Sequence, residues 1–177
     1  MNPPLLVVLG GLPGTGKTTV ARDLLSLVPE LAYVRIDSIE QALRDSGEMG
    51  ARGVQTSGYL VGCALARDLL DSGTSVLTEC VNPLEVSRKW WRDIAASTNA
   101  RLVEVELYCS DLSEHRYRVE NRSVDIDGLV LPTWQDVQER EYEDWSEADL
   151  RIDTSALTAS AAAKLIADAA TSRSRDQ

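Results

Sequence analysis

A chain of 177 residues, with 44% hydrophobic and 26% charged residues, has the size and composition of a globular domain with a proper core. Its formal net charge of −10 argues against a nucleic-acid partner, because affinity for phosphate backbones comes mainly from Lys and Arg. We expect no membrane span, since no apolar run reaches the required length of about 20 residues, and no signal peptide. The three cysteines have no metal-ligand spacing, so we expect reduced thiols and a cytoplasmic protein.

Strand-like stretches alternate along the chain with helix-like ones. We expect strands over residues 4–10, 31–37, 74–80, 101–109 and 149–154. We expect helices over residues 17–28, 38–45, 59–73, 83–97, 111–123, 133–145 and 156–170, the third of them largely buried. Ser38 and Thr133 are candidate N-caps. This order predicts a parallel sheet covered by helices on both faces, in a single domain over residues 1–172 with a polar tail over residues 173–177.

The segment GGLPGTGKTT, residues 10–19, joins the first strand to the first helix and fits the phosphate-binding pattern Gly11-x-x-x-x-Gly16-Lys17-Thr18. Glycines allow successive N–H groups to turn inward and form an anion nest, at which the helix N-terminus also points. Lys17 would reach the β- and γ-phosphates, and the Thr18 hydroxyl would bind Mg²⁺. An ordinary strand-to-helix turn is disfavoured by the apolar strand before it and the amphipathic helix after it. We therefore predict an ATP site built from Gly11, Leu12, Pro13, Gly14, Thr15, Gly16, Lys17, Thr18 and Thr19.

Two acidic residues end predicted strands, at the edge where parallel sheets bind ligands. Asp37 ends the second strand, where a carboxylate can point at the γ-phosphate site and accept a hydroxyl proton. The alternative is a cap or turn aspartate. Glu79 ends the third strand and suits a Mg²⁺-associated carboxylate, acting directly or through water, although aspartate is usual there. The alternative is a solvent-facing glutamate.

A pair of arginines, Arg118 and Arg122, is four residues apart and therefore lies on one face of the helix predicted over residues 111–123. Two such arginines can bind phosphates, and one can stack on a base. The alternative is pairing with Glu114 and Glu120 on a surface helix. We assign no role to His115, the single histidine of the chain.

Together, these motifs resemble those of the small P-loop kinases grouped as AAA-family ATPases or adenylylsulfate-kinase-like proteins. The resemblance runs over nearly the whole chain, through GLPGTGKTT, RIDSIEQAL, ECVNP, EHRYRVENR, LPTWQDVQEREYEDW and LRIDT. The segment after the second strand is also similar to chloramphenicol phosphotransferase, which implies that Asp37 is the base. The Arg-x-x-x-Arg pattern looks like that of nucleoside monophosphate kinases, which implies adenine stacking by Arg118 and phosphate contact by Arg122.

The fold implied by this resemblance is a three-layer α/β/α P-loop kinase fold. It has a five-stranded parallel sheet in the order 2-3-1-4-5 and a mobile helical lid over about residues 113–142, called the lid segment below. The chain departs from true adenylylsulfate kinases, which carry an Asp-Gly-Asp-Asn type motif after the second strand, and from shikimate kinases, which carry a Gly-Gly-Gly motif. The resemblance therefore supports ATP and phosphoryl transfer and leaves the acceptor open.

From the sequence we thus expect an ATP- and Mg²⁺-dependent kinase that phosphorylates a hydroxyl group of a metabolite or antibiotic. Catalysis would rest on Asp37, Lys17 and Arg122, and Mg²⁺ on Thr18 and Glu79. We expect the acceptor over residues 40–59, where Arg44 and Arg52 are available. Two alternatives are a polynucleotide 5′-kinase and a non-catalytic nucleotide-binding switch, which would need no base.

Overall fold

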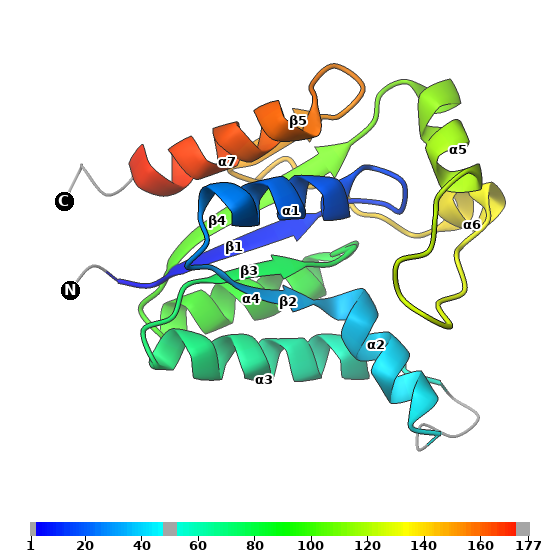
Figure 1. The fold of residues 1–177 in the computed structure, drawn as a ribbon. Coiled ribbons are helices and arrows are strands. Elements are labelled where there is room, and N and C mark those ends of the chain that lie inside the picture. Colours follow the sequence, from blue (N-terminus) through cyan, green and yellow to red (C-terminus); the bar gives the residue numbers. More distant parts are fainter. Residues whose placement is uncertain (1–2, 48–52, 173–177) are drawn as a thin grey trace.

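The computed structural model describes residues 3–47 and 53–172, and these residues contain one five-stranded sheet (Figure 1). The strands are β1 (Leu5–Gly10), β2 (Ala32–Arg35), β3 (Val76–Glu79), β4 (Arg101–Tyr108) and β5 (Leu150–Asp153). They lie in the order β2-β3-β1-β4-β5, and every neighbouring pair is parallel. The parallel sheet with the order 2-3-1-4-5 is therefore confirmed.

Helices cover both faces of the sheet. They are α1 (Lys17–Leu27), α2 (Ile36–Asp45), α3 (Ser57–Asp71), α4 (Glu85–Ser97), α5 (Leu112–Glu120), α6 (Trp134–Glu139) and α7 (Ala159–Ser172). Helices α1 and α7 pack on one face, and α3 and α4 pack on the other. Helices α5 and α6 lie beyond the carboxyl ends of the strands (Figure 1). No helix of the described residues is both long and apolar enough to cross a bilayer.

The central strand β1 explains the apolar run that opens the chain. Leu5, Val7 and Leu9 belong to the core cluster that includes α1 and α7. Leu6 and Val8 belong to the cluster that includes α3 and α4. Because parallel sheets are covered on both faces, both sets of side chains must be apolar. The sheet therefore holds β1 rigidly, and the loop that follows Gly10 starts from a fixed point.

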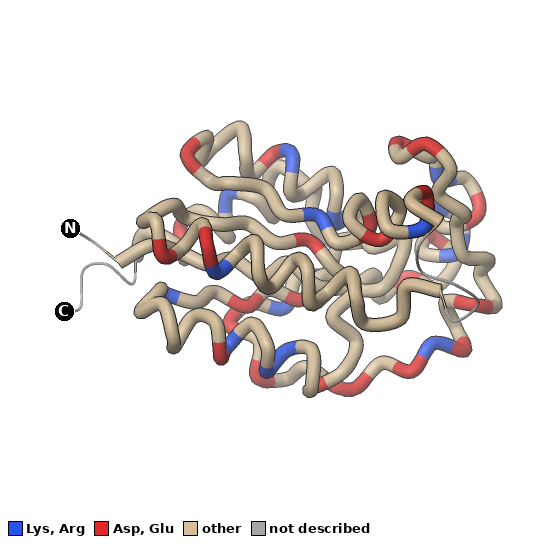
Figure 2. Tube along the Cα trace, turned by 90° about the horizontal axis from the view of Figure 1, so that it is seen from below, with Lys and Arg blue, Asp and Glu red and all other residues tan. Residues whose placement is uncertain are grey.

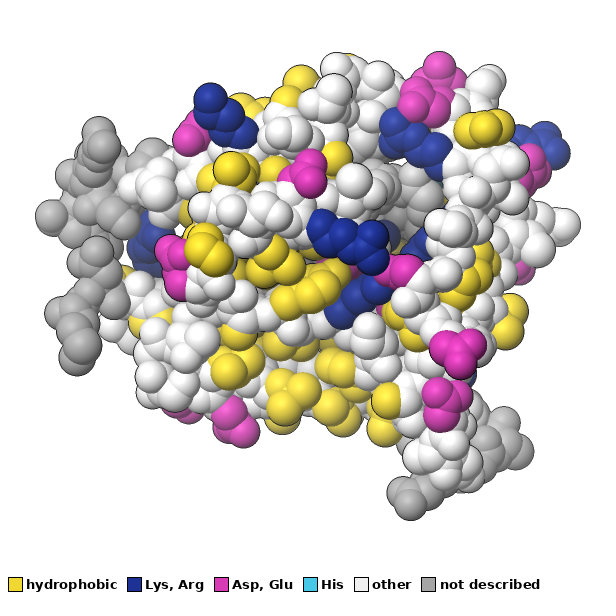
Figure 3. Space-filling view, in the orientation of Figure 1, with side chains coloured by type: hydrophobic (Ala, Val, Ile, Leu, Met, Phe, Trp, Pro, Cys, Tyr) yellow, Lys and Arg dark blue, Asp and Glu magenta, His cyan; other side chains and the backbone are white. Residues whose placement is uncertain are grey.

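Helix α3 is less buried than expected, and the difference brings α2 close. Its buried positions include Gly58, Gly62 and Ala66, whereas Leu60 and Leu65 on the same helix are exposed. Figure 3 shows apolar side chains gathered on the surface over α3. A side chain at Gly62 would clash with Ile36, and one at Gly58 would clash with Glu40, so these glycines let α2 pack closely against α3. The residues of α2 are therefore fixed relative to the sheet.

The second strand is shorter than expected, and the helix after it begins earlier. Strand β2 ends at Arg35 and α2 begins at Ile36, so Asp37 lies in the first turn of a helix rather than at a strand end. Ser38 is inside α2, so the expected N-cap was wrong, and Arg35 occupies that position without a side-chain cap. The apolar pattern of a strand continues to Ile36 because that residue is buried in the same core as the sheet. A carboxylate in the first turn, such as Asp37, is favoured by the helix dipole.

The two helices of the lid segment are also shorter than expected. Helix α5 ends at Glu120 and α6 ends at Glu139. Thr133 caps α6, as expected, and forms a reciprocal capping box with Asp136. The expected continuation of α6 to residue 145 was wrong, because the chain after it packs against the β3–α4 loop instead.

Buried Arg88 joins these two stretches of chain. It is 1% exposed, and its guanidinium donates to four carbonyl oxygens, those of Asn82, Pro83, Glu143 and Asp144. Its guanidinium also lies 4.7 Å from the ring centre of Trp145, in a cation–π contact. A guanidinium with five donors suits four acceptors arranged in this way. Arg88 therefore joins the chain directly after the lid segment to the β3–α4 loop.

Candidate active site

The loop between β1 and α1 has the backbone that a phosphate nest requires. Gly14 and Gly16 have φ values of 82° and 87°, in the left-handed region that other residues rarely adopt. Gly14 also lies against α5, because an added Cβ there would come within 2.5 Å of Val119 Cγ2. Helix α1 begins at Lys17, directly after Gly16, so its free N–H groups point into the loop.

Lys17 is buried inside this loop. Its Nζ atom donates to the carbonyl oxygens of Gly11, at 2.7 Å, and of Leu12, at 2.9 Å. Burial lowers the pKa of its ammonium group, and the charges of Glu79 and Asp37 oppose that effect. A desolvated cation held by two neutral carbonyls interacts strongly with an anion placed beside it.

Thr18 and Glu79 place oxygen atoms of a hydroxyl and a carboxylate beside the phosphate loop. The Thr18 hydroxyl donates to Glu79 Oε1 at 2.7 Å, and the Tyr33 hydroxyl donates to Glu79 Oε2. Glu79 is 3% exposed, so the solvent-facing alternative was wrong. Mg²⁺ takes hard oxygen ligands and keeps several waters, so one hydroxyl and one carboxylate beside the phosphate loop suit it. Among the described residues no group of three or more acidic, His or Cys side chains could hold a metal, so other ligands would be water and phosphate.

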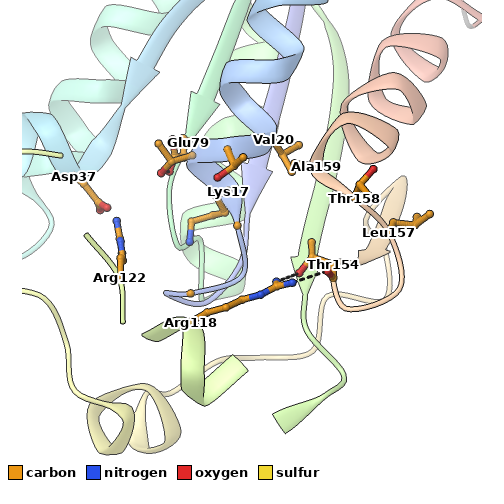
Figure 4. A pocket seen from close by; sticks show the side chains of 14 residues that line it. Lys17, Val20, Asp37, Glu79, Arg118, Arg122, Thr154, Leu157, Thr158 and Ala159 are labelled. Carbon is orange, nitrogen blue, oxygen red and sulfur yellow. Dashed lines mark hydrogen bonds between the residues drawn. The ribbon is translucent and has the colours of Figure 1, made fainter. Parts of the chain in front are cut away.

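A cavity of about 410 Å³ opens between the loop and the carboxyl end of the sheet. It is lined by Gly14, Gly16, Lys17, Thr18, Thr19, Val20, Asp37, Glu79, Arg118, Arg122, Thr154, Leu157, Thr158 and Ala159 (Figure 4). Thus both lid arginines, both metal candidates and much of the phosphate loop line one space. We call it the nucleotide cavity.

Arg118 forms one wall of the nucleotide cavity. Its guanidinium donates to Thr154 Oγ1 at 2.9 Å and to the Thr154 carbonyl at 2.8 Å, contacts that Figure 4 shows as dashed lines. It also pairs with Glu114 at 2.5 Å. The pairing with Glu114 that was considered as the alternative is therefore present, and Arg118 lines the nucleotide cavity at the same time. These contacts join α5 to the loop between β5 and α7.

A second cavity of about 300 Å³ adjoins the first, and we call it the acceptor cavity. Lys17, Asp37 and Arg122 line both cavities. Figure 4 shows the Arg122 side chain pointing toward the Asp37 carboxylate. The remaining lining residues are Pro13, Ile36, Glu40, Arg44, Gln55, Tyr59, Val81, Pro83, Leu129, Val130, Leu131, Pro132 and Arg140. Arg52, expected to be near the acceptor, lies outside the described residues, as does the tail over residues 173–177.

The geometry of the arginine pair corrects the expectation from spacing. Because α5 ends at Glu120 and Asn121 caps it, Arg122 lies beyond the helix and does not share a helical face with Arg118. Arg118 instead faces the β5–α7 loop, and Arg122 faces Asp37. The two side chains still line one cavity, from two different directions.

Two contacts near the site were not expected from the sequence. His115 is 5% exposed, and its Nε2 lies 2.8 Å from the Pro13 carbonyl oxygen of the phosphate loop. Arg35 binds both carboxylate oxygens of Asp125, at 2.8 and 3.0 Å, and its Nε lies 3.8 Å from Glu79. Each contact joins the lid segment to the phosphate loop or the metal candidates. The one available signal was that the single histidine lies beside the lid arginines.

The sequence of residues 6–140 matches the family described as AAA domain. The chain belongs to this family. Two uncharacterized relatives, from Mycobacterium tuberculosis and Mycobacterium bovis, are each 36% identical over 110 residues. Each match covers 56% of this chain but 22% of the relative, so the chain corresponds to a small part of those longer proteins.

Solved structures share the fold of this family member over nearly its whole length. APS kinase CysC of Mycobacterium tuberculosis, in complex with AMPPNP and APS, superimposes with a TM-score of 0.70 at 19% identity, covering 95% of this chain and 98% of that one. The tunicamycin resistance protein of Deinococcus radiodurans gives 0.70 at 16% identity, with 95% and 96% covered. A gluconokinase from Sinorhizobium meliloti gives 0.63 at 20% identity, with 96% and 95% covered. The chain therefore has the P-loop kinase fold.

Proposed function

We propose that the protein is an ATP- and Mg²⁺-dependent kinase that transfers the γ-phosphoryl group to a hydroxyl group of a small molecule. The observation that carries this proposal is that two adjoining cavities share Lys17, Asp37 and Arg122. One cavity contains the phosphate loop, and the other has room for a second molecule. A cation, an acidic group and a second cation at the shared wall are what phosphoryl transfer between two bound molecules requires.

The residues divide the work by position. The loop backbone and Lys17 bind the β- and γ-phosphates, and Arg118 forms the wall on the base side. Thr18 and Glu79 would hold Mg²⁺, which neutralises charge on the phosphates when bound. Asp37 orients the acceptor hydroxyl and accepts its proton as the new oxygen–phosphorus bond forms and the bond to ADP breaks. Arg122 stabilises the charge that develops on the transferred group.

Asp37 distinguishes this proposal from a nucleotide-binding switch. A switch needs no acidic group on the acceptor side of the γ-phosphate site, whereas Asp37 lines both cavities. The other alternative, a polynucleotide 5′-kinase, is opposed by the net charge of −10 and by the spread of charge. Figure 2 shows Lys and Arg positions interspersed with Asp and Glu along the trace. The lid segment, residues 113–142, would close over the bound nucleotide.

A mass-spectrometric screen tests the proposal. The protein is incubated with Mg²⁺–ATP and a library of hydroxylated metabolites and antibiotics, and products heavier by one phosphoryl group are sought. We expect at least one such product, absent with Lys17→Ala and present with Lys164→Ala, a control lysine exposed on α7. ATP hydrolysis without any phosphorylated product, unaffected by Asp37→Asn, would favour the switch instead.

A further inference from the structure

Some of the charged side chains that line the acceptor cavity have no part in the proposed reaction. Lys17, Arg44, Arg122 and Arg140 line it, against the two carboxylates of Asp37 and Glu40. Lys17 and Arg122 belong to the phosphoryl-transfer machinery, which leaves Arg44 and Arg140 without a role in the chemistry. An excess of positive charge inside one cavity is notable in a chain whose formal net charge is −10.

Of these two arginines, Arg44 has an ion-pair partner within the chain and Arg140 has none among the described residues. Arg44 pairs with Glu40 at 3.1 Å, one turn earlier on α2, and its side chain stays 45% exposed. Arg140 makes no ion pair with any residue of the described ranges, 3–47 and 53–172. It lies near enough to Glu40 for its charge to lower the pKa of that carboxyl, whose pKa burial raises. Glu40 is therefore paired with one guanidinium group, that of Arg44, while the charge of a second also acts on it, and one carboxylate neutralises at most one of them.

Helix α2 sets the distance between Arg44 and the proposed base, Asp37. Asp37, Glu40 and Arg44 are at positions i, i+3 and i+7, so they share one face of the helix and all line the cavity. Seven residues of an α-helix rise about 10 Å. The opposite wall, residues 129–132 of the lid segment, is mainly apolar. The cavity therefore offers Asp37 at one end, Arg44 about two helical turns away from it, and an apolar wall formed by residues 129–132.

We propose that the acceptor is a small hydroxylated anion, whose phosphate, sulfate or carboxylate group binds Arg44 and Arg140 while its hydroxyl group lies at Asp37. This inference rests on the proposed function and names the substrate class of the same site. Arginine suits such a group because its planar guanidinium can bind two oxygens at once. A neutral acceptor would leave Glu40 as the one carboxylate lining the cavity near both Arg44 and Arg140, with exposed Asp136 as the other carboxylate near Arg140. Since one cavity of about 300 Å³ accommodates a small molecule, a small anion fits better than a nucleic acid, which needs an extended basic surface.

Binding measurements on the nucleotide-loaded protein test this inference without requiring the true acceptor. The phosphate loop is first saturated with Mg²⁺–AMPPNP, so that it cannot bind a second anion. Calorimetry then compares n-butyl phosphate, which has an anionic group and an apolar part, with n-butanol, at constant ionic strength. We expect saturable binding of butyl phosphate alone, weakened at least about tenfold by Arg140→Ala or Arg44→Ala, as for loss of a charge-assisted hydrogen bond. Arg67→Ala, which removes an exposed arginine of α3 outside both cavities, should change nothing.

Each other outcome has a distinct meaning. Equal binding of butanol, no saturable binding of butyl phosphate, or equal weakening by Arg67→Ala would overturn the anionic acceptor and leave the proposed kinase standing. A short single-stranded oligonucleotide that binds far more tightly than butyl phosphate, with a steep salt dependence, would overturn it in favour of a nucleic-acid acceptor. Failure of Mg²⁺–AMPPNP to bind would overturn the proposed function and the inference together.

Discussion

The nucleotide cavity and the acceptor cavity adjoin each other but are built differently. Three side chains of the nucleotide cavity are held by hydrogen bonds within the chain: Lys17 by two carbonyls, Thr18 by Glu79, and Arg118 by Thr154. By contrast, Arg140 of the acceptor cavity and Arg122, which lines both cavities, make no ion pair with the described residues. The first cavity is formed by the ends of strands and the start of α1, and the second largely by α2 and the lid segment.

This contrast indicates where binding specificity resides. Groups already held by their own chain are preorganised, so the nucleotide site loses little entropy when its ligand binds. Guanidinium groups without a partner interact with whatever anion enters, so the ligand itself completes the second site. The fold would then supply the phosphoryl donor site, and a few side chains on α2 and the lid segment would select the acceptor. The following experiments test this division, starting with the largest expected effect.

Lys17→Ala should strongly weaken phosphate binding in the nucleotide cavity. The buried ammonium is the fixed full charge in the phosphate nest, and neighbouring N–H groups cannot replace it. We expect loss of phosphoryl transfer by at least about 10²–10³-fold, as for removal of a key transition-state donor, and much weaker binding of a non-hydrolysable ATP analogue. Titration calorimetry measures the binding, with Lys164→Ala as the control. Undiminished affinity in Lys17→Ala would refute the assignment of this loop.

Asp37→Asn should affect turnover of the acceptor but not binding of ATP, and so distinguish the roles of the two cavities. The amide keeps the shape of the side chain and removes the charge, so we expect kcat to fall by about 10²-fold or more, the usual effect of losing a general base. ATP affinity should stay within a few-fold, because the proposed role of Asp37 is on the acceptor side. Steady-state kinetics with an acceptor from the screen measures both, and Asp68→Asn, an exposed residue of α3, is the control. Wild-type turnover by Asp37→Asn would leave Asp37 as a helix-end carboxylate only.

His115→Leu should weaken nucleotide binding although His115 does not line the nucleotide cavity. The imidazole lies on the Pro13 carbonyl and packs edge-on against Trp134, with ring centres 5.2 Å apart. Leaving a buried carbonyl without a donor costs about 1–3 kcal/mol, so we expect lower thermal stability and roughly tenfold weaker binding of the ATP analogue. His115→Gln, which can still donate from a similar position, should recover part of both. Equal effects of the two substitutions would show that packing alone matters there.

Asp125→Asn should have the smallest effect and should act on the lid segment. The Arg35 guanidinium holds the pKa of Asp125 below its usual value. The link is therefore complete above the usual Asp pKa of about 3.9 and is lost as pH falls through the lowered value, so it should not change between about pH 5 and 8. Because the Asp125 side chain is still 28% exposed, the pair should contribute about 1 kcal/mol, so hydrogen exchange over residues 121–133 should speed up by about fivefold. Asp127→Asn, two residues further along the same loop, is the control, and an equal effect from it would exclude a specific link.

The sequence predicted those parts of the site whose signal is local. The phosphate loop is readable because glycine spacing, Lys17 and Thr18 are contiguous, and the sheet order followed from the family resemblance. Asp37 was expected at a strand end but lies in the first turn of α2, because the burial of Ile36 looks the same in a strand and in a helix start, and its role as the base stays a prediction. The position of Arg122 outside α5 depends on where that helix ends, which propensity alone does not fix.

Other parts depend on contacts between distant positions and could not be read in this way. His115 meets Pro13 across 102 residues, and Arg35 meets Asp125 across 90. Nothing near His115 in the chain indicates which carbonyl it will reach. The position of Arg140 in the acceptor cavity likewise depends on how the chain returns from α6 to the β3–α4 loop.

Arg88 couples the local unfolding of two segments, one of which, through Pro83, lines the acceptor cavity. One side chain satisfies four carbonyl oxygens from two stretches of chain, residues 82–83 and 143–144. Releasing either stretch leaves the guanidinium, which cannot lose its proton, buried with acceptors missing. The two stretches should therefore open together as one cooperative unit, with a single free energy of local unfolding. Amide exchange in the β3–α4 loop and after α6 would then report one event, although these residues are about sixty positions apart in the chain.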